Sequence, residues 1–473
     1  MYNSSMKVRT RMAPSPTGEY HVGHIRTLLY NYAFARKNEG KFILRIEDTD
    51  QVRLVDGAVE RIMEVIRDYG FSWEEGPDIG GPYAPYTQSE RLDIYKKYAE
   101  ELVSRGYAYR CFCSAERLAQ MREEQKKRGL PSTKYDRHCL HLSPQEIEEK
   151  LKNGESYVIR QKMPDNETIV FKDVVYGEIS YNSQDLDDQV LLKSDGFPTY
   201  QLGVVVDDHL MEITHVMRGN DWLPSTPKHM LLYKAFGWEP PVHIHLPNLK
   251  ELGSTKKLSK RFGPVSAREF LEEGYLPEAI INFLMLLGWN SGTKQEIYSL
   301  DEFIAVFDPE KITKVDLVSF DRAKLDWMNG QYIQKMDLGE LSEKLLPFAP
   351  KTAKLEELKE IVPLINTRMK KLSDFSELCG FLFQSPDGGE DLSDDDKKHI
   401  SKAQEALSNL ETWDLDAINT SLMKAVDENS FKTSKFFMSL RLAITGHKIT
   451  PPLNESLVIL GKEETLARLK RST

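Results

Sequence analysis

The spacing of apolar side chains over the first fifty residues changes period twice. The segment 8–12 is a candidate for a short strand, and the breaker-rich segment 14–18 predicts a turn. Positions 24–37 then carry apolar residues with helical spacing, and 41–46 again has the character of a strand. Two strands joined through a helix form a β-α-β unit, in which the strands lie parallel in one sheet. The opening therefore predicts an α/β fold.

The pattern changes again further along the chain. From 107 to about 181, short strand-like segments such as 157–160 alternate with Cys and His pairs, which indicates an insertion into the sheet domain. The α/β pattern returns at 190–192 and 201–206, and beyond Tyr332 nearly every segment has helical spacing. We therefore expect a sheet domain in two halves, 1–106 and 190–250, around an insertion at 107–189. A region at 251–336 then begins with a Lys-rich loop, and a helical region follows at 337–473.

Length and composition are typical of a multidomain protein without membrane segments. A chain of 473 residues is expected to form about two to four domains. Its richest apolar run, 281–287, is far shorter than the ~20 residues that cross a bilayer. The first residues lack the apolar core of a signal peptide, so we expect a cytoplasmic protein with no membrane partner. A net charge of −10 does not exclude a nucleic-acid partner, because phosphate binding depends on local Lys and Arg patches.

Two histidines mark the expected start of the first helix. His21 and His24 are three positions apart, so their side chains point in nearly the same direction. Gly18 and Gly23 allow a bulky ligand to approach the backbone, and a helix N-terminus attracts phosphate. The alternative for an isolated pair of this kind is two polar caps or half of a metal site.

A Lys-rich segment, 256–261, follows the flexible residues 253–255. Ammonium groups on such a loop can reach the phosphates of ATP as charge moves to the leaving pyrophosphate. Taken alone, the segment fits a solvated surface loop better than a nucleotide site. Its pairing with the histidine motif in one α/β domain favours a nucleotide site.

Four residues in the insertion have the chemistry of a zinc site. Cys111 and Cys113 form one pair, and Cys139 with His141 forms a second. Three thiolates and one imidazole complete a tetrahedral zinc shell. His138 is an alternative ligand, and reduced cysteines without metal are the alternative to zinc. Cys379 stands alone in the helical region and is expected to be a small core residue.

Longer motifs resemble the glutamate/glutamine branch of the class I aminoacyl-tRNA synthetases, and the bacterial glutamyl type in particular. The two ATP signatures of that class are similar to the histidine motif and the Lys-rich loop. The matching segments keep their order along nearly the whole chain: 11–18, 45–50, 192–200, 204–209, 218–226, 320–329, 441–446 and 460–464. The resemblance implies a class I Rossmann-like catalytic domain, an insertion that binds the tRNA acceptor end, a stem-contact region and an all-helical anticodon-binding region. The cysteine spacing also matches a zinc-bearing subgroup of this family.

The resemblance also implies roles for single residues. Arg11 and Arg218 would bind the side-chain carboxylate of glutamate, Glu47 its α-ammonium, and Tyr200 would orient it. An arginine fork fits a carboxylate with two hydrogen bonds, although a lone Arg or Glu is more often part of a surface ion pair. Two further residues would line this pocket, Ala13 and Ser15. Residues implied at the ATP site are Pro14, Thr17, Gly18, His21, Gly23, His24, Lys257, Leu258, Ser259 and Lys260, of which His21, His24, Lys257 and Lys260 would be catalytic.

The implied reaction has two steps. L-glutamate and ATP, with Mg²⁺, give glutamyl-adenylate and pyrophosphate, and the terminal ribose of tRNA(Glu) then takes the glutamyl group. By the same resemblance the first step needs bound tRNA, and the enzyme acts as a monomer. A glutaminyl enzyme would carry a β-barrel C-terminal half, and a shorter relative that glutamylates a tRNA base lacks the helical region. Two further alternatives are a nucleotidyltransferase without an RNA partner and a simple RNA-binding protein. The first would show pyrophosphate exchange that does not depend on tRNA, and the second would show no exchange.

Overall fold

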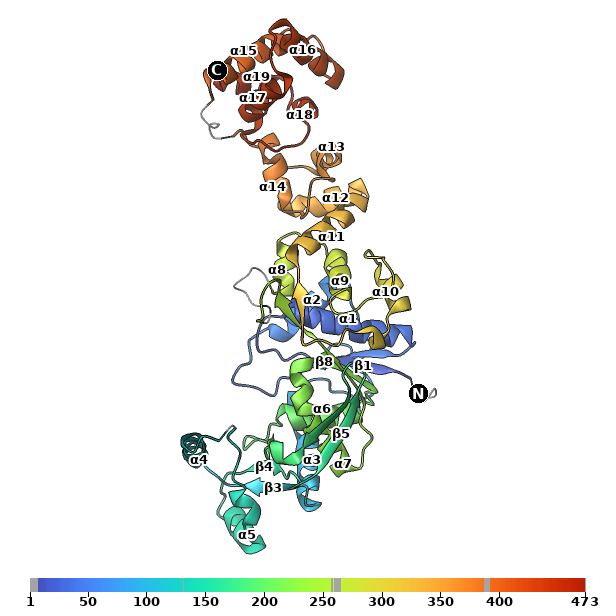
Figure 1. Ribbon diagram of the computed structural model, residues 1–473, viewed down its shortest axis with the longest axis vertical. Coiled ribbons are helices and arrows are strands. Elements are labelled where there is room, and N and C mark those ends of the chain that lie inside the picture. Colours follow the sequence, from blue (N-terminus) through green and yellow to red (C-terminus); the bar gives the residue numbers. More distant parts are fainter. Residues whose placement is uncertain (1–6, 131, 257, 259–264, 387–391, 473) are drawn as a thin grey trace. The chain divides into compact units, whose positions relative to one another are not determined.

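The computed structural model describes residues 7–130, 132–256, 258, 265–386 and 392–472 (Figure 1). Contacts divide the chain into two compact units, 1–268 with 281–321, and 269–280 with 322–473. Lys257, Ser259 and Lys260 lie outside the described residues. Within the described residues, no helix is both long enough and apolar enough to cross a membrane.

The predicted β-α-β unit is confirmed at the start of the first unit. β1 (Arg9–Met12) is fully buried and pairs in parallel with β2 (Lys41–Leu44), and α1 (Val22–Lys37) connects them. β8 (His215–Gly219) lies beside β1, since the Thr214 amide donates to the Arg9 carbonyl at 3.0 Å. β8 pairs in parallel with β9 (Val242–Leu246), which extends the parallel core of the Rossmann-like domain.

The insertion is joined to this core through shared strands. β3 (Ala108–Cys111), β4 (Val158–Gln161) and β7 (Val190–Leu192) form one antiparallel sheet. β5 (Thr168–Asp173) pairs antiparallel with β6 (Gly177–Asn182) and parallel with β9, so part of the insertion extends the catalytic sheet. The sequence pattern indicated a separate insertion and did not show this pairing, because strands 70 positions apart leave no local signal.

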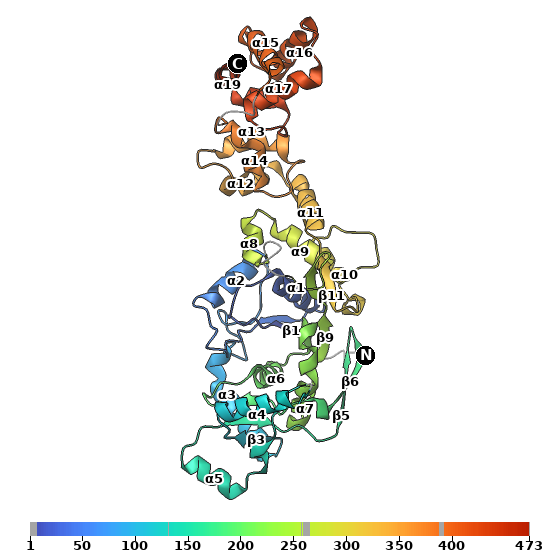
Figure 2. The ribbon, with the colours of Figure 1, turned by 60° about the vertical axis from the view of Figure 1, so that its left-hand side comes forward.

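The remaining helices and strands of the first unit cover these sheets or lie at the edges of the unit (Figures 1 and 2). Segment 201–206, where the α/β pattern returns, lies in a helix. The elements are α2 (Ala58–Asp68), α3 (Leu92–Ser104), α4 (Ala115–Lys127), α5 (Pro144–Lys152), α6 (Tyr200–Leu210), α7 (Thr226–Phe236), β10 (Asn248–Glu251), α10 (Leu300–Val306) and β11 (Leu317–Phe320). Two further helices run across the division of the chain: α8 (Ala267–Glu272) and α9 (Pro277–Met285).

A buried ion pair fixes β1 to the segment after α2. Arg9 donates from both Nη atoms to the Glu75 carboxylate, at 2.8 and 2.9 Å, and Tyr86 donates its hydroxyl hydrogen to the same group at 2.5 Å. Burial alone would raise the pKa of Glu75, but Arg9 and Tyr86 hold it below its usual value. The pair is therefore charged at neutral pH.

The second unit is helical, as the spacing beyond Tyr332 predicts. One core lies among its first helices and includes the buried Cys379, and another lies among helices α15, α16, α17, α18 and α19, which Figure 1 labels. The helices are α11 (Arg322–Lys335), α12 (Leu338–Leu345), α13 (Leu355–Ile365), α14 (Asp374–Cys379), α15 (Asp394–Ser408), α16 (Leu415–Glu428), α17 (Thr433–Thr445), α18 (Leu453–Leu460) and α19 (Lys462–Arg471).

Candidate active site

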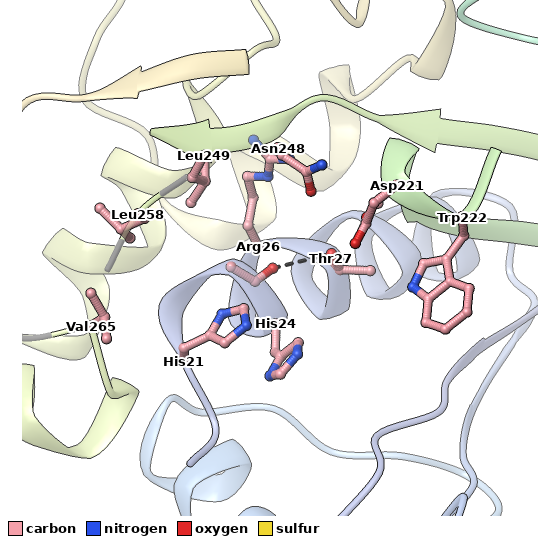
Figure 3. A pocket seen from close by; sticks show the side chains of 12 residues that line it. His21, His24, Arg26, Thr27, Asp221, Trp222, Asn248, Leu249, Leu258 and Val265 are labelled. Atoms are coloured by element: carbon pink, nitrogen blue, oxygen red, sulfur yellow. Dashed lines mark hydrogen bonds between the residues drawn. The ribbon is translucent and has the colours of Figure 1, made fainter. Parts of the chain in front are cut away.

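A cleft with a cavity volume of about 230 Å³, partly open to solvent, lies at the N-terminal end of α1 (Figure 3). Its walls come from α1, the segment after β8, β10, and the flanks of the Lys-rich loop. The lining residues are His21, Gly23, His24, Arg26, Thr27, Gly219, Asp221, Trp222, Asn248, Leu249, Leu258 and Val265. The histidine motif and Leu258 of the Lys-rich segment therefore line one cleft.

The two histidines of the first motif stack on each other. The ring centroids of His21 and His24 are 3.6 Å apart, with 22° between the ring planes. A Cβ atom at Gly23 would lie 2.9 Å from the His21 ring, so glycine permits this packing. Burial, with a smaller contribution from His21, lowers the pKa of His24 to about 3. His24 is therefore a neutral hydrogen-bonding group at the first turn of α1, where backbone N–H groups favour an anion.

The cleft also contains residues that the sequence analysis did not select. Arg26 is buried on α1 and donates from Nη1 to the Leu287 carbonyl at 3.2 Å and from Nη2 to the Pro247 carbonyl. Asp221 and Asn248 lie across the cleft from α1 (Figure 3). Arg26 could have been found as the polar residue five positions after His21 on an otherwise apolar helix face.

Arg218, the residue expected to bind a carboxylate, is buried at the end of β8 and held by four side chains. Its Nη1 donates to the Tyr200 hydroxyl at 2.8 Å, and its Nη2 to Thr226 Oγ1 at 2.9 Å. Its Nε donates to His245 Nε2 at 3.0 Å, and His229 Nδ1 lies 3.4 Å from Nη1. The guanidinium therefore has several fixed hydrogen bonds, none of which is to a carboxylate.

Arg11 and Glu47 belong to a buried network of charges beside this group. Arg11 and Arg45 both donate to Asp208, at 3.0 and 2.8 Å, and Arg45 also donates to Glu47 at 3.0 Å. Burial raises the pKa of Glu47 in spite of the nearby arginines. Burial also raises the pKa of Tyr200, while the positive charges of Arg218 and Arg11 oppose the rise and the charge of Glu47 adds to it. The structure thus brings Arg11, Glu47, Tyr200 and Arg218 within electrostatic range of one another.

The other residues expected at the substrate sites lie on two loops. Ala13, Pro14, Ser15, Thr17 and Gly18 occupy the connection between β1 and α1, where the Glu47 amide donates to the Pro14 carbonyl at 2.9 Å. Leu258 lines the cleft, and its amide donates to the Leu249 carbonyl at 2.9 Å. The positions of Lys257, Ser259 and Lys260 remain predictions.

Comparison with known proteins decides the family. Residues 7–327 match the family described as "tRNA synthetases class I (E and Q), catalytic domain", and residues 340–473 match "Anticodon binding domain". The chain belongs to the class I tRNA synthetases of the E and Q type. This synthetase is 46% identical over 475 residues to a "Glutamate--tRNA ligase" of Clostridium tetani, with 98% of this chain and 97% of the relative covered. A relative of the same description from Clostridium botulinum is 45% identical, with 99% of both chains covered.

A solved structure is similar over the whole length of this synthetase. It is described as the crystal structure of a glutamate tRNA ligase from Elizabethkingia meningosepticum in complex with its amino acid. The two chains are 38% identical, each is covered to 99%, and the TM-score is 0.88. The Rossmann-like catalytic domain and helical anticodon-binding region implied by the sequence motifs are confirmed.

The synthetase also brings three cysteines together in the insertion. The sulfur atoms of Cys111, Cys113 and Cys139 all lie within 4.8 Å of one another. The Tyr135 hydroxyl lies 3.3 Å from the Cys111 sulfur and 3.2 Å from the Cys113 sulfur, and it accepts a hydrogen bond from the Cys139 amide at 3.0 Å. His141 lies two residues after Cys139 in an exposed position, outside the group of three sulfurs. Three clustered sulfurs have the donor chemistry of a zinc site.

Proposed function

We propose that this synthetase is a glutamate–tRNA ligase that activates L-glutamate with ATP and transfers it to the terminal adenosine of tRNA(Glu). The observation that carries the proposal is the buried guanidinium of Arg218, whose direct hydrogen-bond partners are neutral. A buried positive charge of this kind is stabilised by an anionic ligand. The side-chain carboxylate of glutamate supplies that charge, and the amide of glutamine does not.

Glutamate has charged groups at both ends, and the site offers a counter-charge for each. Arg218, with Tyr200 oriented by it, binds the side-chain carboxylate, and Arg11 lies close enough to add to the positive field. Glu47 accepts from the α-ammonium group. Ala13 and Ser15 line the pocket between these ends, on the loop after β1.

ATP binds in the cleft at α1. The α-carboxylate of glutamate attacks the α-phosphorus, the bond to the bridging oxygen breaks, and pyrophosphate leaves. His21, His24 and the amides of the first turn of α1 donate to phosphate oxygens, while Lys257 and Lys260 neutralise the leaving group. Pro14, Thr17, Gly18 and Gly23 leave space for the nucleotide, and Leu258 and Ser259 lie along it. Mg²⁺, when bound with ATP, adds positive charge at the phosphates.

In the second step the 2′-hydroxyl of the terminal ribose of tRNA attacks the mixed anhydride, and AMP leaves. The region 340–473 matches an anticodon-binding family, which supports tRNA as the partner. The insertion at 107–189 binds the acceptor end, and 251–336 contacts the stem. The enzyme acts in the cytoplasm as a monomer.

One structural zinc ion stabilises the insertion. Cys111, Cys113 and Cys139 supply three thiolates, and His141 supplies the fourth ligand, because imidazole is a far more common zinc ligand than a phenol. Four protein ligands leave no open position for a reactive water, so the ion's role is to hold β3 against the turn that carries Cys139.

Aminoacylation assays test the function directly. Purified protein, ATP and glutamate are incubated with tRNA(Glu) or tRNA(Gln), and charged tRNA is measured. We expect charging of tRNA(Glu), and pyrophosphate exchange only when tRNA is present. Exchange without tRNA would instead indicate a small-molecule nucleotidyltransferase, and charging with glutamine but not glutamate would indicate a glutaminyl enzyme.

A further inference from the structure

We propose that Asp173 and His245 are positioning residues that fix Arg218 in the orientation required to bind the side-chain carboxylate of glutamate. The inference rests on the proposed function, because it assigns Arg218 to that carboxylate. It adds a specific arrangement: a carboxylate, an imidazole and a guanidinium in series, contributed by β5, β9 and β8.

The series is buried and its contacts are short. Asp173 Oδ2 lies 2.7 Å from His245 Nδ1 and also accepts the His245 amide at 3.1 Å. Asp173 Oδ1 accepts the amides of Val175 and Tyr176, both at 2.9 Å. The side chains of Asp173 and His245 are both 0% exposed. All available acceptor directions of the Asp173 carboxylate are therefore used, and the group cannot turn away from the imidazole.

These contacts determine the tautomer of His245. A carboxylate is only an acceptor, so the Nδ1 atom of His245 must carry the hydrogen. Burial lowers the pKa of His245 to about 4, which leaves the ring neutral and the lone pair on Nε2 free. Arg218 Nε donates to that lone pair at 3.0 Å. An aspartate orients a histidine for a third group in the same way in the serine protease triad.

A second neutral imidazole, that of His229, also has one nitrogen held by a neighbour and the other facing Arg218. His229 Nε2 lies 2.5 Å from Gln201 Oε1, so it carries the hydrogen, and His229 Nδ1 is the acceptor that faces Arg218 Nη1 at 3.4 Å. Burial, with Arg218 next, holds the pKa of His229 well below its usual value. Two neutral rings thus accept hydrogen bonds from Arg218 without cancelling its charge. An acid in their place would compete with the substrate carboxylate for the guanidinium.

The first experiment removes the carboxylate and keeps its shape. In Asp173→Asn the amide oxygen is required by the amides of Val175 and Tyr176, so the NH₂ group faces His245 Nδ1 and no longer accepts the His245 amide. The hydrogen of the ring then moves to Nε2, where it opposes the N–H of Arg218. We expect the KM for glutamate to rise tenfold or more and the KM for ATP to change less than twofold. An unchanged KM for glutamate would overturn the proposal.

Two substitutions of the imidazole give a matched pair. The amide of His245→Gln can place an oxygen where Nε2 lies, whereas the shorter amide of His245→Asn reaches only the position of Nδ1. We expect the KM for glutamate to remain within threefold of the native value in the first and to rise tenfold or more in the second. His243→Gln is the control, because His243 is buried on the same strand, 6.0 Å from the His245 ring, and hydrogen-bonds to the Pro241 carbonyl. Equal effects of His245→Gln and His245→Asn would refute the role of Nε2 as acceptor.

The tautomer can be measured in the unaltered enzyme. Nitrogen-15 chemical shifts of His245, assigned by its loss in His245→Gln, should show a neutral ring with hydrogen on Nδ1. Hydrogen on Nε2 would contradict the proposal whatever the KM of the Asp173 variant. This readout does not depend on the reaction. If the native enzyme does not charge tRNA(Glu) but the Nδ1 tautomer is found, the proposed function fails while the arrangement around Arg218 stands.

Discussion

Arg11 donates two hydrogen bonds to the carboxylate of Asp208, from Nε at 3.0 Å and from Nη2 at 3.2 Å. Burial alone would raise the pKa of Asp208, but Arg11 and Arg45 hold it below its usual value, so the aspartate is charged. The charge of Arg11 is therefore matched inside the protein. Arg218 hydrogen-bonds to neutral groups, and we therefore expect the substrate carboxylate to balance its charge.

Selectivity for glutamate over glutamine should depend mainly on Arg218. A charged hydrogen bond contributes about 1.5–3 kcal/mol, and ~1.4 kcal/mol corresponds to tenfold. We expect Arg218→Ala to raise the KM for glutamate and to reduce the ratio of kcat/KM for glutamate over glutamine at least tenfold. Arg218→Lys should restore only part of the ratio, because an ammonium keeps the charge but not the planar fork. An unchanged ratio in Arg218→Ala would exclude this residue from the pocket.

Metal content should depend on the three sulfurs and on His141. Elemental analysis of the reduced, purified protein should find about one zinc per chain, and Cys139→Ser should lose it. His141→Ala should bind zinc more weakly, whereas Tyr135→Phe should retain it. Loss of zinc in Tyr135→Phe, together with full zinc binding in His141→Ala, would make Tyr135 the fourth ligand. Because the site lies in the insertion, Cys139→Ser should impair the use of tRNA more than the binding of ATP.

His24 should act without titrating in the working pH range. Its pKa of about 3 means that the ring is neutral at every pH above about 4. Removing one preorganised donor to a developing charge costs about a hundredfold in rate. We expect His24→Ala to lower kcat for tRNA-dependent pyrophosphate exchange by about that factor between pH 5.5 and 8.5, with the shape of the profile unchanged. Loss of an acidic limb in the variant would show that His24 titrates there.

The pair formed by Glu75 and Arg9 should stabilise the fold in a pH-dependent way. The pKa of Glu75 is lower in the folded protein than in the unfolded chain, so its contribution is present above about pH 4.3 and is lost as pH falls through the folded value. Breaking a buried pair from one side costs about 3–5 kcal/mol. We expect Glu75→Gln to lower the free energy of unfolding by about 3 kcal/mol at pH 7.

Chemical unfolding at pH 7 and pH 3 measures this effect. The deficit of Glu75→Gln should be smaller at pH 3, because below about pH 4.3 the glutamate of the unfolded chain is protonated and the charged native carboxylate contributes less stability. Glu101→Gln removes an exposed pair with Arg105 and serves as the control, with an expected change below about 1 kcal/mol. A deficit of the same size at both pH values would rule out the ionised pair as its source.

The sequence predicts local elements and motif positions better than contacts between distant segments. Strand 8–12, helix 24–37 and the helical spacing beyond Tyr332 are confirmed because each signal lies within a short stretch of chain. The three cysteines could be grouped by spacing and thiol chemistry alone. In contrast, Asp173 and His245 are 72 positions apart in segments without a motif, and their contact depends on the pairing of β5 with β9.

The charge network around Arg11 could not be predicted for a related reason. Arg11, Arg45 and Asp208 come from three separate segments, and each residue alone fits a surface ion pair. Which acid balances which arginine is set by side-chain packing in the folded sheet. The sequence motifs therefore predict Arg11 at the site, but they do not predict its partner.

The pairing of β5 with β9 means that the insertion is not a removable module. The Val174 amide donates to the His243 carbonyl at 3.0 Å, and Asp173 accepts the His245 amide at 3.1 Å. A shortened catalytic core lacking 107–189 would leave one edge of β9 with unpaired backbone groups, which is a template for aggregation. Any minimal version of this enzyme must therefore keep the β5–β6 hairpin, even if it dispenses with the turn that carries Cys139 and helices α4 and α5.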